Sequence, residues 1–402
     1  MSLDLNVTAL KIDQMVASLK VRENERKLRL DNALGAIKTF GVSEYNQVKV
    51  RSESFYWHAP QIKNDPVGKH AQGTLPDDFC VVAVDGSHID IDRHLPVRCS
   101  LINIGVASLN YGSHPDANLF SQQKLYVNDE LVIRDKNSLH REQAIEGVVL
   151  SAKRAVEEIE TLSQIIDGMN PEVPTIALID GSLVMMGLDG HAYGDFVKRE
   201  LIEEGFVKAL NNIHKLATHR TIALASYISL PRSAEIVNAL RIEVCPFDTV
   251  DCRMHCNDKA IGERPCDHTS ESLLDREIFS EVLEPGERSG IFISSSDIVF
   301  NHYGSQEICF FYVNTGEEIG RVEIPSWVAE NEELLRLVHS AIVDQCRRGS
   351  GYPTALIEAH EQAVINTSNR RDFTHLIETA LYKHHMPVYS SEKNRSKRLR
   401  SL

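Results

Sequence analysis

Long apolar runs are absent from the sequence. No uninterrupted apolar stretch approaches the ~18 residues that a membrane-spanning helix needs, so we expect no membrane partner. The first residues also lack the basic flank, short apolar block and small-residue cleavage site of a secretory signal. These two absences make a cytoplasmic location the expectation.

Positive charge is also scarce. The formal net charge of −14 excludes a protein covered in basic surface. It does not exclude a nucleic-acid partner, because an acidic outer surface can coexist with a basic channel.

Nothing resembles a phosphate-binding P-loop, the Gly-x-Ser-x-Gly turn of hydrolases, or a His-Glu-x-x-His zinc helix. The mechanisms that depend on these motifs are therefore not expected.

The composition that remains suits a globular protein. Of the 402 residues, 25% are charged and 42% are hydrophobic, and the length allows one large domain or two ordinary ones. We expect three parts. Residues 1–58 form an N-terminal helical arm with a connector, residues 59–385 form an α/β domain, and residues 386–402 form a flexible basic tail.

Hydrophobic periodicity divides the body into alternating strands and helices. Helical spacing runs through residues 1 to about 45, and a loop-rich connector is expected over 46–78. Strands are predicted at 79–85, 100–109, 123–134, 176–179, 221–226, 290–294, 307–313 and 321–324. Helices are predicted at 141–166, 195–216, 330–346 and 353–365, with another around 236–240. Buried strands that follow helices and proline-bearing loops indicate an α/β fold.

The two most apolar strands end in the same three residues, Asp-Gly-Ser. Residues 176–179 lead into Asp180, and residues 81–84 lead into Asp85. One copy alone fits an ordinary strand and turn, because Asp and Gly are common turn residues. Two copies predict two carboxylates at one edge of one sheet, an arrangement suited to divalent metal ions.

The longest helix predicted in the body offers a third carboxylate. Glu158 shares a face with Leu162, the side that packs on the sheet, and a carboxylate there must be paired or coordinated. Glu157 has Lys153 one turn away and is expected to be solvated. The alternative is that Glu158 simply pairs with Arg154, and spacing alone does not separate the two interpretations.

The last predicted helix adds a histidine. His360 lies near the buried side marked by Leu356 and Ala359. A single histidine there is more often a hydrogen-bonded core residue than a ligand, but three converging carboxylates favour the ligand role. Three oxygen ligands and one imidazole suit Mn²⁺ or Mg²⁺ rather than structural Zn²⁺. Such ions can activate water and stabilise the leaving oxygen in phosphodiester cleavage.

Six segments together resemble the NurA family of DNA end-processing nucleases. They are, in order, VAVDGS, KRAVEEIETL, IALIDGSL, ASYISLPRSAEIVNALR, NHYGSQEICFFYVNTGEEIGRVEIPSWV and GYPTALIEAHEQAV. They span roughly residues 75–370, and their combined order is more specific than any one segment. The resemblance implies an RNase H-like core with a mixed β-sheet flanked by helices, related to the nuclease domain of Argonaute proteins.

The same resemblance implies an activity and partners. It implies Mn²⁺-dependent cleavage of DNA, as a 5′-to-3′ exonuclease and single-strand endonuclease, in double-strand break repair. It also implies a homodimer that docks on the hexameric ATPase HerA, which moves DNA into the nuclease.

Residue roles follow from the resemblance as well. The family's metal ligands, which form its catalytic centre, fall on Asp85, Glu158, Asp180 and His360. Glu157 is the alternative to Glu158 because the two are adjacent. Tyr227 matches a family tyrosine near the metals, with Tyr303 as a rival. Arg232 is a candidate phosphate contact, although an exposed arginine that contacts only water is commoner.

Two groups of residues lie outside this pattern. The polar insertion at about 245–270 contains Cys245, Cys252, Cys256 and Cys266. Their spacing loosely resembles a structural Zn²⁺ site, and the alternative is a polar loop with reduced thiols. The basic tail offers further candidate DNA contacts, Lys397, Arg398 and Arg400.

The leading hypothesis is therefore a metal-dependent deoxyribonuclease, a hydrolase acting on phosphodiester bonds. An alternative of another class is a catalytically silent DNA clamp or adaptor for a HerA-type ATPase. The presence of all four ligand types favours the enzyme. A third hypothesis is a metal-dependent phosphatase that uses one Asp-Gly-Ser carboxylate as its nucleophile.

Overall fold

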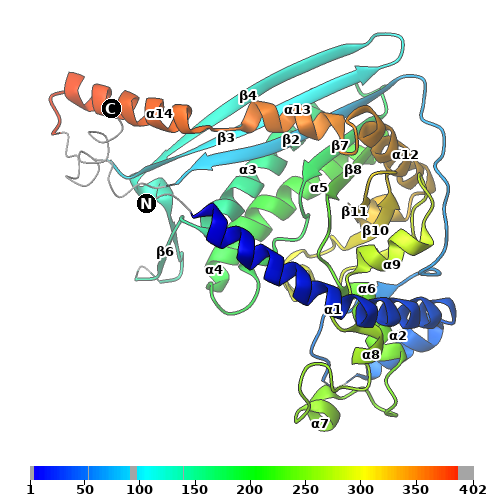
Figure 1. The fold of residues 1–402 in the computed structure, drawn as a ribbon. Coiled ribbons are helices and arrows are strands. Elements are labelled where there is room, and N and C mark those ends of the chain that lie inside the picture. The colour runs from blue at the N-terminus through cyan, green and yellow to red at the C-terminus, as the bar shows by residue number, and fades with distance from the viewer. Residues whose placement is uncertain (1–3, 53, 91–96, 139, 388–402) are drawn as a thin grey trace. The chain divides into compact units, whose positions relative to one another are not determined.

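The computed structural model describes residues 4–52, 54–90, 97–138 and 140–387 (Figure 1). The chain divides into two compact units. Unit 1 comprises Met1–Ala71, Ser229–Ser295 and Phe310–Arg321, and unit 2 comprises Gln72–Ile228, Ser296–Cys309 and Val322–Leu402. The domain boundaries expected at 58 and 385 stay predictions. None of the described helices is long and apolar enough to cross a membrane.

Unit 2 is built on a mixed sheet in the strand order β8-β7-β2-β3-β4. Its strands are β2 (Phe79–Ile89), β3 (Cys99–Tyr111), β4 (Asp116–Val127), β7 (Thr175–Asp180) and β8 (Ile222–Ile228). The first three pair antiparallel in chain order, whereas β7 lies parallel to both β2 and β8. This sheet, with helices on both of its faces, confirms the predicted α/β fold with a mixed sheet.

Two helices that matter for function cover opposite faces of this sheet (Figure 1). On one face, α3 (Val148–Asp167) shares a hydrophobic core with even-numbered residues of β2 such as Val82 and Val84. On the other, α13 (Thr354–Ala363) lies so close to β3 that a Cβ at Gly105 would be 2.1 Å from the carbonyl oxygen of Ala359. Because strand side chains alternate, neighbouring residues of β2 face different helices.

The remaining elements of unit 2 frame this core. A small separate sheet consists of β5 (Val132–Arg134) and β6 (Glu142–Ala144). The helices are η1 (Asn128–Leu131), η2 (Met186–Leu188), α4 (Asp195–Lys198), the π-helical η3 (Arg199–Phe206), α5 (Val207–Ala217), α10 (Asp297–His302), α11 (Ser326–Ala329), α12 (Glu332–Arg348) and α14 (Thr367–Lys383). Residues 322–325 of β11 (Ile319–Pro325) extend the sheet beside β8.

Unit 1 has its own core, rich in aromatic side chains. Phe279, Phe292, Phe310 and Tyr312 are all fully buried and lie ring against ring. The elements around them are α1 (Leu5–Lys38), α2 (Val42–Arg51), β1 (Gln61–Ile62), α6 (Glu235–Glu243), α7 (Cys252–Cys256), α8 (Asp267–Ser270), α9 (Asp275–Val282), β9 (Phe292–Ile293) and β10 (Ile308–Asn314). The strands of this unit follow the order β1-β9-β10.

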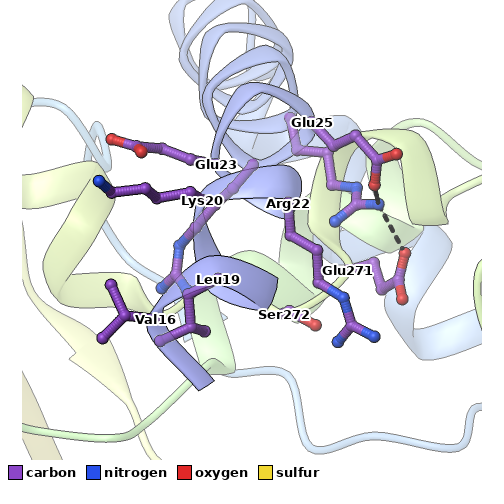
Figure 2. A pocket seen from close by; sticks show the side chains of 10 residues that line it. Val16, Leu19, Lys20, Arg22, Glu23, Glu25, Glu271 and Ser272 are labelled. Carbon is purple, nitrogen blue, oxygen red and sulfur yellow. Dashed lines mark hydrogen bonds and ion pairs between the residues drawn. The ribbon is translucent and has the colours of Figure 1, made fainter. Parts of the chain in front are cut away.

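The N-terminal helix α1 is buried at one end only. Ala33 and Ile37 belong to the core of unit 1, whereas Leu5 and Leu10 are 70% and 65% exposed. Midway along, a hollow between α1 and the start of the loop before α9 is lined by Val16, Leu19, Lys20, Arg22, Glu23, Glu25, Arg26, Arg29, Glu271 and Ser272 (Figure 2). The Arg29–Glu271 ion pair of 3.1 Å fastens this part of α1 to unit 1. The predicted helical arm is thus confirmed.

Several predicted boundaries are wrong. The predicted connector includes α2, which ends only at Arg51, and the strand expected at 123–134 already ends at Val127. The helix expected from 141 begins at Val148, because residues 142–144 pair with β5 instead. A further helix, α14, follows α13, and its largely exposed residues gave no apolar stripe to detect.

Candidate active site

The two Asp-Gly-Ser segments lie side by side on the central strands of unit 2. In the parallel pair β2–β7, Val84 is opposite Ile179, so Asp85 and Asp180 each come one residue after the last pair. Asp180 ends β7, and Gly181 turns the chain with a φ of +88°, a conformation that favours glycine. The turn is fixed by Ser182, whose hydroxyl donates a 2.7 Å hydrogen bond to the Glu323 carboxylate. The predicted turn after Asp180 is confirmed.

The prediction of a turn after Asp85 is wrong. β2 continues through Gly86 and Ser87 to Ile89, because it stays paired with β3 as far as the Ile89–Leu101 pair. Asp85 therefore projects from the middle of a long strand, next to the place where its parallel neighbour β7 ends. The two aspartates still lie at one level of the sheet.

His360 reaches this level from α13. Its Nδ1 lies 2.7 Å from Oδ2 of Asp85, and 60% of its side chain is exposed. The helix is held down at the same place, because Asn103 donates a hydrogen bond to the carbonyl oxygen of Ala363. The absence of a side chain at Gly105 lets α13 approach the strand closely enough for this contact. His360 thus combines a fixed backbone with a ring open to solvent.

Glu158 approaches from α3 and is 5% exposed. It occupies the space left by Gly86, where a Cβ would be 2.4 Å from its Oε1. The Arg154 Nε is 3.1 Å from this oxygen, yet neither atom has a well-aligned hydrogen-bond partner among the described residues. Burial raises the pKa of Glu158 to about 8; Arg154 opposes the rise, and Asp85 and Asp180 add to it. The sequence left open whether Glu158 faces the site or pairs with Arg154, and the structure shows both.

Asp180 has a partner that the sequence did not reveal. The Tyr352 hydroxyl, just before α13, donates a 2.6 Å hydrogen bond to Oδ1 of Asp180. Although Asp180 is accessible to solvent, the surrounding protein desolvates its carboxyl and raises its pKa. Tyr352 and His360 oppose this rise, and the nearby Asp85 adds to it. Tyr352 lies within a segment that carried the family resemblance, but no spacing marked it.

Glu157 is not solvated, contrary to prediction. It is 2% exposed, and both of its carboxylate oxygens are bonded. Lys124 and Tyr126 of β4 donate hydrogen bonds to it, and Lys153 forms a 2.9 Å ion pair one turn back. Burial works to raise the pKa of Glu157, but these three donors lower it overall. The partners on β4 are distant in sequence, which is why helix spacing missed them.

The other candidates are placed as follows. Tyr227 is opposite Asp180 in the β7–β8 pair, is fully buried, and packs edge-on against Tyr352 with ring centroids 5.4 Å apart. Its rival Tyr303 is also buried, and its hydroxyl bonds to backbone groups of residues 183 and 185. Arg232 is an exposed residue of unit 1. Lys397, Arg398 and Arg400 lie outside the described residues.

The four cysteines of the insertion line a single cavity in unit 1. The structure contains Cys245, Cys252, Cys256 and Cys266 as free thiols. Within residues 4–387, apart from the three short gaps, no three His, Cys, Asp or Glu side chains already stand at the spacing of a complete metal site. This finding applies equally to the carboxylates of unit 2.

The carboxylates of unit 2 nevertheless fit a divalent cation. Asp85 and Asp180 both raise the pKa of Glu158, and Asp85 also raises the pKa of Asp180, so a positive charge among the three carboxyls is electrostatically favourable. Oxygen donors with one imidazole are the ligand types that Mn²⁺ and Mg²⁺ accept. Asp85, Glu158, Asp180 and His360 are therefore the residues that could hold it.

Comparisons with known proteins identify one family. The sequence model of the NurA domain family matches residues 80–365. No curated protein matches the chain. Among solved structures, the NurA nuclease from Sulfolobus solfataricus is 13% identical with a TM-score of 0.45, covering 96% of this chain and 98% of that one.

Two further solved structures are similar over much of the chain. A NurA structure bound to dAMP and manganese is 13% identical with a TM-score of 0.34, covering 92% of this chain and 94% of that one. The Argonaute from Aquifex aeolicus is 9% identical with a TM-score of 0.25, covering 72% of this chain and 28% of that one.

Proposed function

Because the chain belongs to the NurA family, we propose that it is a metal-dependent deoxyribonuclease that hydrolyses phosphodiester bonds in DNA. The observation that carries the proposal is the buried Glu158 carboxyl near Asp85 and Asp180, whose Oε1 has no well-aligned hydrogen-bond partner among the described residues although Arg154 lies 3.1 Å away. An uncompensated carboxylate of this kind is unfavourable for folding and is retained where it binds a ligand.

Asp85, Glu158, Asp180 and His360 would hold one or two Mn²⁺ ions, with Mg²⁺ as the possible substitute. When bound, such ions activate water and stabilise the leaving oxygen of a phosphodiester. The chain's own residues position the groups that this chemistry needs. Tyr352 orients the Asp180 carboxylate through its hydrogen bond, and the exposed ring of His360 faces the side from which a substrate arrives. Tyr227 supports Tyr352 from β8.

Finer features rest on the family resemblance. We propose 5′-to-3′ exonuclease and single-strand endonuclease activity in DNA end resection and repair, in the cytoplasm, as a homodimer with a HerA-type hexameric ATPase. Sedimentation of the purified protein tests the dimer. Co-purification with a HerA-type ATPase tests the partnership. A protein that is monomeric and does not co-purify with the ATPase would contradict this part of the proposal.

Cleavage of end-labelled linear DNA with Mn²⁺, Mg²⁺ or EDTA tests the activity. The Asp180→Asn protein should lose Mn²⁺-dependent cleavage while its melting behaviour and DNA binding persist. Asp116→Asn, which changes an exposed aspartate of β4, is the matched control and should cleave normally. Cleavage that persists in Asp180→Asn would contradict the site. No cleavage by the native protein, even with the ATPase, would favour a silent clamp.

Basic residues outside the site are proposed to contact DNA phosphates. They are Arg232, Lys397, Arg398 and Arg400. Removing residues 386–402 should weaken DNA binding and flatten its salt dependence, because each lost phosphate contact lowers the slope of log K against log salt by about 0.7 to 0.9. An unchanged slope would exclude the tail from binding.

A further inference from the structure

Four cysteines of unit 1 surround one cavity although they come from different parts of the insertion. Cys245 follows α6, Cys252 and Cys256 begin and end α7, and Cys266 precedes α8. We call these four residues the cysteine cluster. The pKa of Cys252 is raised by burial, and Cys256, Cys266 and Cys245 each add to the rise. The other three thiols are therefore close enough to Cys252 to influence its charge.

The walls of the cavity are largely apolar, and its cysteines are partly or fully buried. Aromatic, aliphatic and proline side chains complete its lining: Phe55, Trp57, Pro246, Phe247, Val250 and Pro265. Thiolates in such surroundings are stable only with positive charge beside them, because burial penalises the charged form.

Two arginines bring positive charge to the cluster. Arg241 is 8% exposed, donates from Nη1 to the Cys266 sulfur at 3.4 Å, and is held by a 2.7 Å ion pair to Asp267. Its guanidinium also lies over Trp57 at 4.3 Å. In the described part of the chain, the buried Nε atoms of Arg241 and Arg264 have no hydrogen-bond partner. Both arginines line the cavity, so unused donors lie beside the thiols.

The insertion contains little regular secondary structure. Residues 245–266 contain one five-residue helix and no strand, and Met254 and Ile261 are 77% and 75% exposed. Small segments without a substantial apolar core are commonly stabilised by disulfides or by a metal ion. All four cysteines are free thiols, so a metal is the remaining cross-link available to this segment.

We propose that Cys245, Cys252, Cys256 and Cys266 bind one structural Zn²⁺ as thiolates. Four thiolates around Zn²⁺ carry a net charge of −2, which Arg264 and the Asp267-paired Arg241 offset in part. Zn–S bonds of about 2.3 Å require the thiols to draw closer than the present arrangement, in which no three of the described candidate ligands form a complete site. Binding releases the thiol protons and fixes the insertion.

The test measures metals in the full-length protein, expressed with zinc in the medium and dialysed against EDTA to remove weakly held ions. Elemental analysis should find about one zinc per chain. Cys252→Ser and Cys256→Ser should lose it, whereas Cys99→Ser, which changes a buried cysteine of β3 in unit 2, should keep it. Asp180→Asn should also keep it, which separates this inference from the proposed nuclease centre.

A second measurement uses the native protein and so does not depend on whether the cysteine variants fold. A mercurial reagent that modifies thiols should release zinc stoichiometrically from the native protein, detected with a colorimetric zinc indicator. Zinc retained by both cysteine variants and lost from Asp180→Asn would overturn the proposal, because the ion would then belong to unit 2. Absence of zinc from the native protein, or iron with inorganic sulfide in its place, would overturn it as well.

Discussion

The two sides of α3 bury neighbouring glutamates in opposite ways. Towards β4, Glu157 meets two lysines and a tyrosine, and its pKa is lowered. Towards β2, Glu158 meets one misaligned arginine and two aspartates, and its pKa rises to about 8. The two residues are almost equally buried, at 2% and 5% exposure. Burial alone therefore does not mark a functional carboxylate, whereas burial without sufficient positive charge does.

The comparison assigns the two glutamates different tasks. Glu157 fastens α3 to the edge of the sheet through bonds that are complete within the chain. Glu158 keeps an oxygen free at the level of Asp85 and Asp180. A completed network stabilises the fold, and an incomplete one is available to a ligand. Substitution of each residue by its amide should separate stability from activity.

The largest expected effect is that of a Glu158 substitution on DNA cleavage. Glu158→Gln should reduce Mn²⁺-dependent cleavage by more than about 100-fold, because even indirect partners of a metal ligand contribute about 10- to 100-fold. The same substitution should raise the melting temperature in EDTA at neutral pH, since glutamine avoids the cost of protonating a buried carboxyl on folding. A variant that lost both activity and stability would contradict the proposed division of tasks.

The next largest effect is that of a Glu157 substitution on the free energy of unfolding. Glu157→Gln should lower the free energy of unfolding by about 1–3 kcal/mol, because Lys124 and Lys153 lose their counter-charge while retaining some contact with solvent. Cleavage per folded molecule should change little. Denaturant unfolding measures the loss, and Glu160→Gln on the same helix is the control, expected within about 0.5 kcal/mol of the native protein.

A smaller effect is expected from the tyrosine that orients Asp180. Tyr352→Phe removes one hydrogen bond to a carboxylate and should reduce cleavage by about tenfold, the value of a hydrogen bond of 1.4 kcal/mol. Stability should be nearly unchanged, because the ring and its contact with Tyr227 remain. A large fall in melting temperature would show instead that Tyr352 stabilises the fold, as Glu157 does.

The final prediction concerns pH dependence. Because the folded-state pKa of Glu158 is raised from 4.5 to about 8, its contribution to stability is fully present below 4.5 and is lost as the pH rises through 8. The lowered pKa of Glu157 acts in the opposite sense, and its contribution is lost only as the pH falls below 4.5. Between about pH 5 and about pH 9 in EDTA, the melting temperature should decline less in Glu158→Gln than in the native protein.

The sequence predicted the fold class and the convergence of Asp85 and Asp180, because both depend on local features: an apolar strand followed by a carboxylate. It also placed Glu158 on the inward face of its helix, since helical spacing fixes that face. What it could not supply were contacts made across the sheet. The extension of β2 past Asp85 depends on β3, and the burial of Glu157 depends on β4.

Tyr352 shows the same limit on a smaller scale. It lies in the short loop between α12 and α13, where no periodicity applies, and only the folded path of that loop brings its hydroxyl to Asp180. The ligand roles of the four predicted residues stay predictions until metal binding is measured.

The close approach of α13 to Gly105 has a consequence for how this centre can vary. A layer of side chains between a helix and a strand behaves as an elastic spacer, since rotamers absorb small errors in position. No such spacer separates Ala359 from β3, so the height of His360 above the sheet is set by backbone against backbone. Substitutions at position 105 can therefore shift His360 only by displacing the whole helix, and fine adjustment of this centre is left to the side chains around Glu158 and Asp180.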